Sequence, residues 1–507
     1  NVPLSADPGK DEPGLSPPLL GAVEKKLAQL TTSFSSQDSA TLHPESLTVK
    51  RKSFDARVRR PNTEPSFAYV VDVRFAGPVT MPVATGAAEP LLDGLTHEEE
   101  KEVSSNNPPR LRGADEGDRP SVVVVGAGPA GLLLGHLLRA EGIDCLVLDR
   151  QSPDYILGRI RAGVLETITV SLMERLGLDT RLKAEGLWHD GFQLADGERL
   201  IRIDLADLTG SRVMVYGQTE LTRDLMQAAD ERGLEIEYGA REVALHGVEG
   251  DAPHVTWTDA NGAQQRVDCR FIVGCDGFHG PSRKAIPANA GKGFERVYPF
   301  GWLGILADVP PCHHELIYAS HERGFALASM RSETRSRYYV DVPAGEDVAN
   351  WPDERVWDEL ALRLGEEAAA GMVRGPSIEK SIAPLRSFVF EPMRHGSLLL
   401  CGDAAHIVPP TGAKGLNLAA SDVYYAAEAL TNFFAHNSRD AVAAYSTKAL
   451  ARVWKAERFS WSLTRLMHRF PEDGAFERKM QLAELDYIAS SRAAQQSIAE
   501  NYVGLPV

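Results

Sequence analysis

The sequence predicts an α/β fold, in which a dinucleotide-binding βαβ domain receives an inserted mixed β-sheet domain and is followed by a helical C-terminal region. Residues 121–150 run from a β-branched strand through a glycine-rich turn and a helical stretch to a second apolar strand. Strand-like runs such as RFIVGC, GWLGILADV and RSRYYVDV occupy the middle of the chain. After Gly415, apolar residues recur at helical spacing through LNLAASDVYYAAEALTNFF and AVAAYSTKALARVWKAERF.

Composition narrows the class of protein. A chain of 507 residues with 43% hydrophobic and 24% charged residues has the balance of a globular protein with a large core. Its net charge of -16 argues against a sequence-independent hold on nucleic acid, which requires clustered Lys and Arg. The uncharged run at 121–138 contains glycines and a proline, so we expect a strand turning into a helix rather than a membrane span. The 5 cysteines lack paired C-x-x-C spacing, which predicts no metal site and is typical of a reducing cytoplasm.

Residues 1–119 differ from the rest of the chain. Proline-rich stretches, a Ser/Thr-rich patch and an acidic run predict a partly disordered N-terminal extension. Within it, SLTVKRKSFDARV and SFAYVVDVRF are each patterned as a short strand of a small β-containing module, and VSSNNPPRLRGADEGDRP has the composition of a linker. The remaining expected domains are the first part of the βαβ domain at 120–295, a substrate-binding β-sheet domain at 296–390, and a second cofactor motif with the helical C-terminal region at 391–507.

A GxGxxG turn joins the first strand to the first helix. Gly126, Gly128 and Gly131 let backbone N–H groups and the positive end of the helix dipole approach a pyrophosphate, as in a Rossmann-like fold. Such a turn is a weak signal on its own. Asp149 strengthens it, because a carboxylate at the end of the second strand accepts hydrogen bonds from an adenosine ribose. The combination therefore predicts a dinucleotide site.

Two further motifs follow in the chain, and each alone is compatible with an ordinary turn. Cys275-Asp276-Gly277 ends an apolar run, and Gly402-Asp403 follows a strand shortly before Gly415-Leu416-Asn417 opens a helix. In this order, the three motifs resemble those of the flavoprotein aromatic hydroxylases. In that family the aspartate of the third motif holds the ribityl chain of FAD, and the helix start faces the flavin ring.

The resemblance extends from residue 121 to the C-terminus. GRIRAGVLE, VYGQTELTRDLM, RVYPFGWLG, SIAPLRSF, WKAERFSW and IAENYVGLP are similar, in the same order, to segments of the branch of this family that hydroxylates 4-hydroxybenzoate. It implies FAD as the cofactor, NADPH and O2 as cosubstrates, and a homodimer, while the cysteines favour the cytoplasm. The chain departs from the family at Asp149, Met330 and Cys401, where Glu, a polar residue and a small residue are usual, and throughout residues 1–119, which these hydroxylases lack.

Matched position by position, the resemblance assigns Ser329, Arg331 and Tyr339 to the carboxylate of a small aromatic acid. These residue types suit a carboxylate, because a guanidinium donates two parallel charge-assisted hydrogen bonds to its oxygens and the two hydroxyls can donate further ones. The resemblance also implies a relay that carries the proton of the substrate's 4-hydroxyl outward through two phenols to a histidine, with a backbone carbonyl as a further contact of that hydroxyl. These catalytic residues are Tyr318, Tyr502, His189 and Pro410.

The cofactor residues are carried over in the same way. The resemblance implies that FAD is held by Gly126, Gly128, Gly131, Asp149, Arg159, Arg161, Gln218, Asp276, Arg337, Asp403, Lys414, Gly415, Leu416 and Asn417. It implies that NADPH is held by Arg150, Gln151, Tyr155, His279 and Arg386. Positive charge beside the flavin ring is useful, because it stabilises the anionic reduced flavin.

The activity that the resemblance implies is hydroxylation of 4-hydroxybenzoate to 3,4-dihydroxybenzoate through a flavin C4a-hydroperoxide. A simple phenol ionises near pH ~10, so the tyrosine relay has a purpose: removing the proton makes the ring carbon beside the oxygen more electron-rich. Two alternatives stay open. One is a hydroxylase of another substituted benzoate, such as 4-aminobenzoate; the other is an uncoupled NAD(P)H oxidase or redox sensor.

Overall fold

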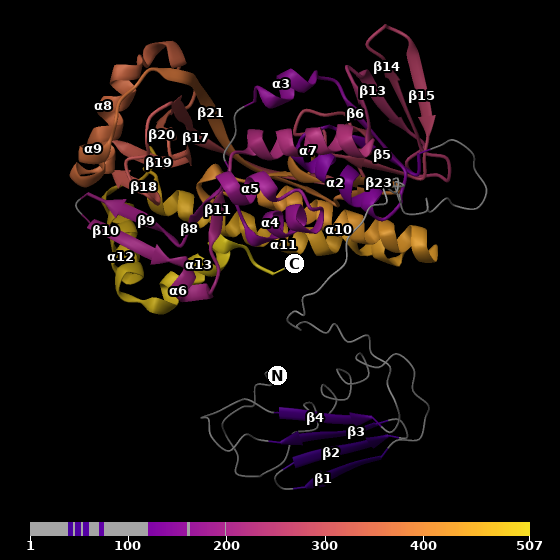
Figure 1. The fold of residues 1–507 in the computed structure, drawn as a ribbon. Coiled ribbons are helices and arrows are strands. Elements are labelled where there is room, and N and C mark those ends of the chain that lie inside the picture. Colours follow the sequence, from indigo (N-terminus) through magenta and orange to yellow (C-terminus); the bar gives the residue numbers. More distant parts are fainter. Residues whose placement is uncertain are drawn as a thin grey trace, which may run out of the picture. The chain divides into compact units, whose positions relative to one another are not determined.

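The chain divides into two compact units, residues 1–103 and 104–507 (Figure 1). None of the helices in the part of the chain that the structure describes combines the length and the apolar character that crossing a membrane demands. The computed structural model describes residues 39–43, 46–51, 54–59, 70–75, 120–159, 163–197 and 199–506.

The described residues of the first unit form an antiparallel sheet in the order β1-β2-β3-β4. The prediction of one strand at SLTVKRKSFDARV is wrong, because this stretch contains two strands, β2 and β3, which pair antiparallel with Arg51 opposite Phe54. The two residues between these partners, Lys52 and Ser53, include no glycine, asparagine or proline, so the sequence carries no turn signal there. The strands are β1 at Ser39–His43, β2 at Ser46–Arg51, β3 at Phe54–Arg59 and β4 at Val70–Phe75.

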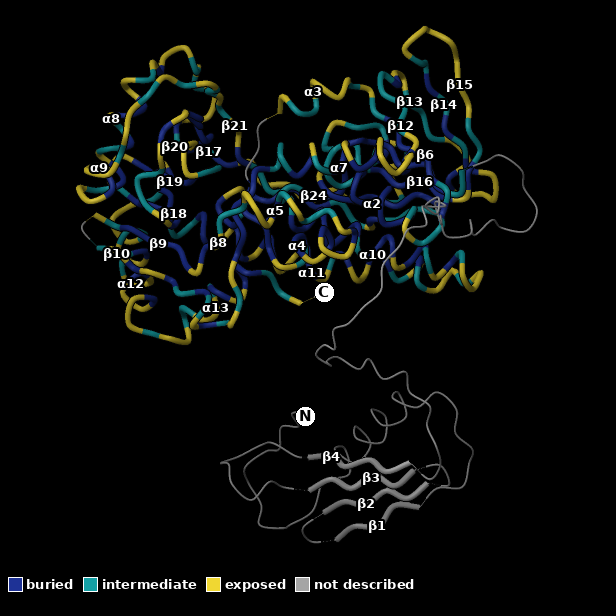
Figure 2. The backbone as a smooth tube through the Cα atoms, viewed as in Figure 1, coloured by how far each residue is buried: buried dark blue, intermediate teal, exposed yellow. Residues whose placement is uncertain are grey.

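The second unit is built on a six-stranded sheet in the order β12-β6-β5-β16-β23-β22. Its first five strands are parallel to their neighbours, and β22 is antiparallel to β23. The run VVVV of β5 is buried, as expected of a parallel strand that is covered on both faces. Figure 2 shows the residues around this sheet as largely buried. The strands are β5 at Val122–Val125, β6 at Cys145–Asp149, β12 at Glu235–Tyr238, β16 at Phe271–Gly274, β22 at Arg394–His395 and β23 at Leu398–Leu400.

Helices α2, α4, α7, α10 and α11 pack against one another beside this sheet (Figure 1). The predicted βαβ unit is confirmed as β5, α2 and β6. The helical pattern expected after Gly415 is confirmed as α10 and α11. In α10, residues 417–423 are all buried, whereas the buried positions of α11 recur at intervals of about one helical turn. The helices are α2 at Pro129–Ala140, α4 at Thr167–Arg175, α7 at Gln218–Arg232, α10 at Gly415–His436 and α11 at Asp440–Met467.

An eight-stranded mixed sheet is the other large sheet of this unit, in the order β10-β9-β18-β19-β20-β17-β21-β24. One of its faces packs under α8 (Asp353–Leu364) and α9 (Glu366–Gly371), and the other shares a core with α11, α12 (Ala475–Ser490) and α13 (Arg492–Val503). β9 and β10 come from residues before 296, so the sheet is larger than the range 296–390. Its strands are β9 at Gly191–Asp196, β10 at Arg199–Asp204, β17 at Lys292–Ala307, β18 at Leu316–His321, β19 at Gly324–Ser332, β20 at Arg335–Pro343, β21 at Ser377–Glu391 and β24 at His406–Ile407.

Smaller elements complete the described part of the second unit. One three-stranded sheet has the order β7-β11-β8, and another has the order β13-β14-β15. The remaining elements are α3 at Pro153–Leu157, β7 at Val164–Leu165, α5 at Thr180–Glu185, β8 at Leu187–His189, α6 at Leu205–Thr209, β11 at Val213–Val215, β13 at Arg241–His246, β14 at His254–Thr258 and β15 at Gln264–Asp268, with short 3-10 turns at Arg283–Ala285, Val348–Asn350, Gly402–Ala404 and Pro410–Gly412.

Candidate functional site

A cavity of about 800 Å³ lies where the two large sheets and the start of α10 meet. Its walls include the carboxyl ends of β5, β6 and β16, where parallel α/β sheets commonly bind ligands, and side chains of β18, β19 and β20. Most of the predicted site residues lie in its wall. These are Gly126, Gly128, Asp149, Arg150, Gln151, Tyr155, Arg159, Gln218, Asp276, His279, Tyr318, Ser329, Arg331, Arg337, Tyr339, Arg386, Asp403, Pro410, Lys414, Gly415 and Leu416.

The other predicted site residues are not in the wall. Gly131, Asn417 and Tyr502 are buried just behind it, and their contacts are described below. His189 is buried on β8 without reaching the cavity. Arg161 lies outside the described residues. We find no group of three or more His, Cys, Asp or Glu side chains in the described ranges that could hold a metal ion.

The glycine-rich turn is shaped for close approach. Gly126 has a φ of +111°, and a Cβ added there would lie 2.3 Å from the carbonyl oxygen of Cys275. A Cβ on Gly131 would lie 1.8 Å from the carbonyl oxygen of Gly126, so this glycine lets α2 pack directly against the turn. At Gly128 a Cβ would meet nothing within 4 Å, so the missing side chain leaves open space at the N-terminus of α2. A phosphate fits such a position, where backbone N–H groups and the helix dipole favour negative charge.

Two carboxylates lie in the wall at strand ends. Asp149 accepts hydrogen bonds from the backbone N–H of Ala127 (2.7 Å) and of Gln151 (2.8 Å), which fix its orientation. Its oxygens keep lone pairs that can accept further bonds from hydroxyls. Asp276 accepts a hydrogen bond from the N–H of Ser282 at 2.8 Å, and its Oδ1 is buried with no hydrogen-bond partner among the described residues. Burial raises the pKa of Asp276.

Asp422 of α10, which the sequence did not single out, fixes the third motif. Its Oδ2 accepts the backbone N–H of Gly402 at 2.9 Å and lies 2.6 Å from Nε2 of His406. Burial alone would lower the pKa of His406, but the carboxylate of Asp422 outweighs it and raises the pKa. The hydrogen bonds of Asp422 therefore hold the Gly402–Asp403 turn in place, with Asp403 in the cavity wall.

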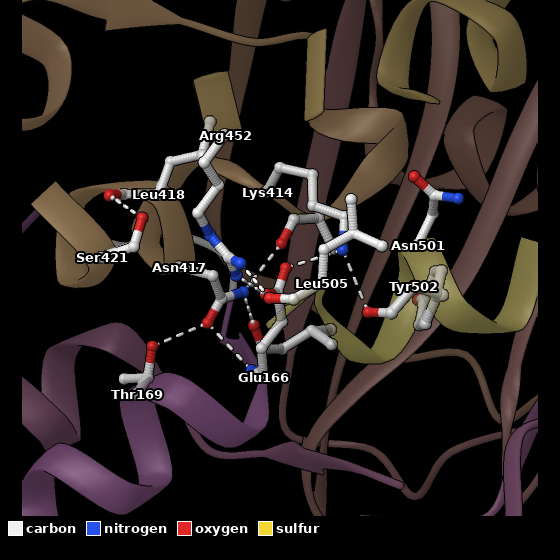
Figure 3. A network of polar contacts seen from close by, with 12 residues as sticks. Glu166, Thr169, Lys414, Asn417, Leu418, Ser421, Arg452, Asn501, Tyr502 and Leu505 are labelled. Atoms are coloured by element: carbon white, nitrogen blue, oxygen red, sulfur yellow. Dashed lines mark hydrogen bonds and ion pairs between the residues drawn. The ribbon is translucent and has the colours of Figure 1, made fainter. Parts of the chain in front are cut away.

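A buried ionic network supports the start of α10 (Figure 3). Glu166 binds Nζ of Lys414 at 2.6 Å and Nη2 of Arg452 at 3.0 Å. Lys414 also donates to the carbonyl oxygen of Tyr502 at 3.0 Å. Oδ1 of Asn417 accepts from the backbone N–H of Glu166 at 2.9 Å and from the hydroxyl of Thr169 at 2.8 Å. Burial lowers the pKa of Lys414, and Glu166 partly offsets this effect.

This network combines two cations with one carboxylate, so a positive charge is left beside the cavity. The sequence missed Glu166 and Arg452, because 286 positions separate them and only the fold brings them together. Asn417 stays a predicted flavin residue, and its side-chain amide is bonded within the protein: its Nδ2 donates to the carbonyl oxygens of Val164 and Ala413, both at 2.9 Å. The contacts of Asn417 make it a brace between α10 and the segment around Glu166.

Arg331 is a cation without a carboxylate partner among the described residues. Its Nη1 donates to the carbonyl oxygen of Met330 at 2.8 Å, its Nη2 lies 3.4 Å from Oη of Tyr339, and its Nε is buried and unpaired in that part of the chain. Burial lowers the pKa of this guanidinium. Burial alone would raise the pKa of Tyr339, but Arg331 and Arg337 outweigh it and lower the pKa. This corner of the cavity is therefore suited to an anion.

The three residues assigned to a carboxylate are neighbours because β19 and β20 pair antiparallel. Ser329 lies opposite Arg337, and Leu327 lies opposite Tyr339. The hydroxyl of Ser329 donates to the carbonyl oxygen of Arg337 at 2.6 Å, which leaves the hydroxyl oxygen able to accept. Arg337 itself forms an ion pair with Glu379, so its charge is compensated while that of Arg331 is not.

Tyr318 and Tyr502 form a hydrogen-bonded pair, with 2.9 Å between their hydroxyl oxygens. Phe192 stacks on Tyr502 with 4.1 Å between ring centroids, which fixes the second ring behind the first. Burial raises the pKa of both phenols. Pro410, also in the wall, accepts the backbone N–H of Ala413 at 2.9 Å and retains a second lone pair on its carbonyl oxygen.

His189 is not in direct contact with this tyrosine pair. Its Nδ1 has no hydrogen-bond partner in the described ranges. Burial lowers its pKa to about 4, and the carboxylate of Glu315 opposes this effect. The imidazole is therefore neutral near pH 7 and is able to accept a proton.

The sequence did not indicate that Trp302 lines the cavity or that His468 is its hydrogen-bond partner. Trp302 lies in the wall, 5.2 Å from Tyr339 between ring centroids, and its Nε1 donates to Nε2 of His468 at 2.8 Å. Nδ1 of His468 donates to the carbonyl oxygen of Thr464 at 3.1 Å, which fixes the tautomer. Burial lowers the pKa of His468 to about 3, so it remains a neutral acceptor. No local pattern signals this pair, because 166 positions separate its members.

Comparisons with known proteins agree with this geometry. Residues 119–460 match the model of the FAD binding domain family. The chain is 54% identical over 389 residues to p-hydroxybenzoate hydroxylase of Acinetobacter baylyi, which covers 76% of this chain and 96% of that protein. It is 28% identical to rifampicin monooxygenase of Rhodococcus hoagii, over 60% of this chain and 62% of that protein. The fold is similar to the crystal structure of p-nitrophenol 4-monooxygenase from Pseudomonas putida, with a TM-score of 0.65 and 18% identity over 77% of this chain and 99% of that one.

Proposed function

This chain belongs to the family of FAD-dependent aromatic monooxygenases that includes p-hydroxybenzoate hydroxylase, and we propose that it converts 4-hydroxybenzoate to 3,4-dihydroxybenzoate with NADPH and O2. One observation carries the proposal. Arg331 and Tyr318 line the same cavity. The guanidinium of Arg331 has no carboxylate partner among the described residues, and the hydroxyl of Tyr318 is hydrogen-bonded to that of Tyr502. A substrate that carries both a carboxylate and a phenol is complementary to this arrangement.

The residues of the cavity fit FAD. The open position at Gly128 and the N-terminus of α2 suit its pyrophosphate, and Asp149 suits the hydroxyls of its adenosine ribose. The positive charge of the network around Lys414 and the start of α10 suit the flavin ring, which becomes negative on reduction. Bound FAD supplies the activation of O2 and the delivery of one oxygen atom to the aromatic ring.

We assign the substrate carboxylate to Ser329, Arg331 and Tyr339. The guanidinium supplies the charge, and the hydroxyls of Ser329 and Tyr339 supply neutral contacts. The walls formed by Trp302 and Leu327 are apolar and exclude water from the ring. His468 keeps the indole of Trp302 in place through its hydrogen bond.

We assign removal of the proton from the substrate's 4-hydroxyl to Tyr318 and Tyr502. Tyr318 accepts it and passes a proton to Tyr502, and the proton continues to His189 through an intervening water, since the described residues provide no direct contact there. With a pKa of about 4, His189 is neutral near pH 7, so it passes the proton on to solvent and does not retain it. The carbonyl of Pro410 binds the same hydroxyl and keeps it directed at Tyr318.

Tyr318→Phe is expected to leave carboxylate binding largely intact while lowering the yield of hydroxylated product per NADPH. The substrate would bind without losing its proton, so oxygen would be released as H2O2 instead. Tyr502→Phe should give the same result. Product yield and H2O2 release are measured together at saturating substrate. Tyr338→Phe is the matched control, because Tyr338 faces the core under α8 and should not change the yield. Unchanged yield in both relay variants would show that the relay is misassigned.

We assign the 2′-phosphate of NADPH to the rim around α3, where Tyr155 is 48% exposed and Arg150 directly follows β6. Arg150→Ala is expected to raise the KM for NADPH by about one to two decades, because a charge-assisted bond contributes roughly 1.5–3 kcal/mol. The KM for NADH should change little. Steady-state rates with both nucleotides check this, with Arg175→Ala as a control, since Arg175 is bound to Glu141 on the surface. Equal effects on the two nucleotides would contradict the assignment.

The proposed substrate is tested by following NADPH oxidation with a panel of aromatic acids. 4-Hydroxybenzoate should stimulate NADPH oxidation and yield product, whereas 4-aminobenzoate and benzoate should stimulate it weakly and yield little. NADPH oxidation that is independent of substrate and yields only H2O2 would favour an oxidase or a redox sensor. We further propose that the enzyme is a homodimer, as its family resemblance implies, and that it is cytoplasmic, as its cysteines favour; light scattering gives its mass in solution.

A further inference from the structure

Two cysteines lie next to each other at neighbouring strand ends in the wall of the cavity. β16 and β23 are adjacent and parallel, with Gly274 opposite Leu400, and the next residues along them are Cys275 and Cys401. The backbone pairing continues at this level, because the N–H of Cys401 donates to the carbonyl oxygen of Gly274 at 2.9 Å. Residues at the same level of parallel strands point to the same face, so the two thiols share one side of the sheet.

The separation of the two positions suits a disulfide. Neighbouring strands lie about 4.8 Å apart, and the Cα atoms of bonded cysteines are usually about 4.4–6.8 Å apart. Both cysteines line the cavity, which gives a small reagent a route to them. The sequence alone could not reveal the pair, since Cys275 and Cys401 are far apart in it and Cys401 stands where the family usually has a small residue.

The surroundings of Cys275 keep its thiol protonated. The hydroxyl of Tyr445 donates to the carbonyl oxygen of Leu400 at 2.7 Å, so the thiol of Cys401, 3.1 Å away, donates to Oη of Tyr445. The thiol of Cys401 and burial both raise the pKa of Cys275, and the charges of Asp276 and Asp422 act in the same direction. Oxidation is therefore expected to be slow near neutral pH, since the thiolate is the reactive form.

We propose that Cys275 and Cys401 are a modification site at which a peroxide converts two thiols into a disulfide. The sulfur of one cysteine attacks the O–O bond of hydrogen peroxide, which forms an S–O bond and releases one water. The sulfur of the other cysteine then attacks that sulfenic sulfur, which forms the S–S bond, breaks the S–O bond and releases a second water. Two thiols lose two hydrogens and two electrons, and one peroxide becomes two waters. The second step is fast because the two groups are already neighbours.

The test uses the FAD-loaded full chain, incubated with excess hydrogen peroxide, quenched with acid and digested without reduction. A peptide linked through Cys275 and Cys401 should appear, and the denatured chain, which has 5 cysteines, should show two fewer titratable thiols. Dithiothreitol should reverse both changes. Absence of the linked peptide, or a link only between different chains, would overturn the proposal.

Single variants separate this pair from the other cysteines. Cys401→Ala and Cys275→Ala should each abolish the reversible loss of two thiols. Cys312→Ser is the matched control, because Cys312 lies beside Tyr338 of β20, in the other large sheet. This variant should still form the linked peptide. If Cys312→Ser abolishes the thiol loss, or if Cys401→Ala retains it, the disulfide joins other residues and the proposal is wrong.

Discussion

Arg331→Ala is expected to weaken 4-hydroxybenzoate binding by roughly thirty-fold to several thousand-fold. Removing one partner of a buried, hydrogen-bonded charge pair costs about 2–5 kcal/mol, and each 1.4 kcal/mol is about tenfold in affinity. Arg331 qualifies because its Nε is buried and no carboxylate among the described residues balances its charge. Its loss would leave the substrate carboxylate desolvated and unpaired in the cavity.

The measurement is a titration of purified variants with 4-hydroxybenzoate, followed by the change in flavin absorbance. FAD content should be unchanged, because the residues proposed to hold its pyrophosphate and ribose are at the other large sheet. Arg335→Ala is the control: Arg335 starts the same strand, β20, but is exposed and bound to Asp308 at 2.6 Å. Arg331→Lys should bind 4-hydroxybenzoate with intermediate affinity, since lysine keeps the charge but cannot make the two parallel hydrogen bonds of a guanidinium. If Arg331→Ala binds substrate as tightly as the parent, the transfer of site residues from the family is wrong although the fold is right.

Glu166→Gln is expected to lower the free energy of unfolding by about 3–5 kcal/mol, as found when one partner of a buried ion pair is removed. The side chains of Glu166, Lys414 and Arg452 are 3%, 4% and 8% exposed, so both cations would lose their carboxylate away from water. The C-terminal segment should loosen as well. Arg452 donates to the carbonyl oxygen of Leu505, and a Cβ on Gly504 would lie 2.1 Å from Oε2 of Glu166, so this segment is packed directly on the network.

Urea-induced unfolding followed by tryptophan fluorescence, at equal FAD saturation, gives the difference between Glu166→Gln and the parent. Glu141→Gln is the matched control, because Glu141 also binds an arginine, Arg175, at 2.7 Å, but the two side chains are 35% and 51% exposed. An exposed pair contributes only about 0–1 kcal/mol. Similar small losses in the two variants would mean that the network around Lys414 is not a stabilising feature.

Local patterns predicted the parts of the fold that depend on neighbouring residues. The glycine turn at Gly126 follows from the strand and helix on either side of it, and the long helix from Gly415 follows from its apolar period. Ser329, Arg331 and Tyr339 meet because one tight hairpin joins β19 to β20, so their spacing in the sequence already places them together. A comparison of motifs could therefore predict that these three residues lie close together.

Contacts between residues far apart in the sequence could not be predicted from local patterns. No glycine, asparagine or proline separates β2 from β3 in the sequence, so nothing there indicated that they are two strands. β9 joins the large sheet by pairing with β18, which lies far along the sequence. The same holds for the bond between Trp302 and His468. The side-chain amide of Asn417 bonds to the carbonyl oxygens of Val164 and Ala413, and these partners could not be predicted from the motif, because a motif identifies a position and not the groups that the rest of the fold brings to it.

The central claim is that this enzyme places one atom of O2 on 4-hydroxybenzoate. Its most direct test is a reaction with oxygen-18-labelled O2, NADPH and 4-hydroxybenzoate, in which the product is identified by mass spectrometry and NADPH consumption is measured. We expect 3,4-dihydroxybenzoate that contains one labelled oxygen, with nearly one product formed per NADPH consumed. Consumption of NADPH with H2O2 as the only product, or hydroxylated product without the label, would contradict the claim.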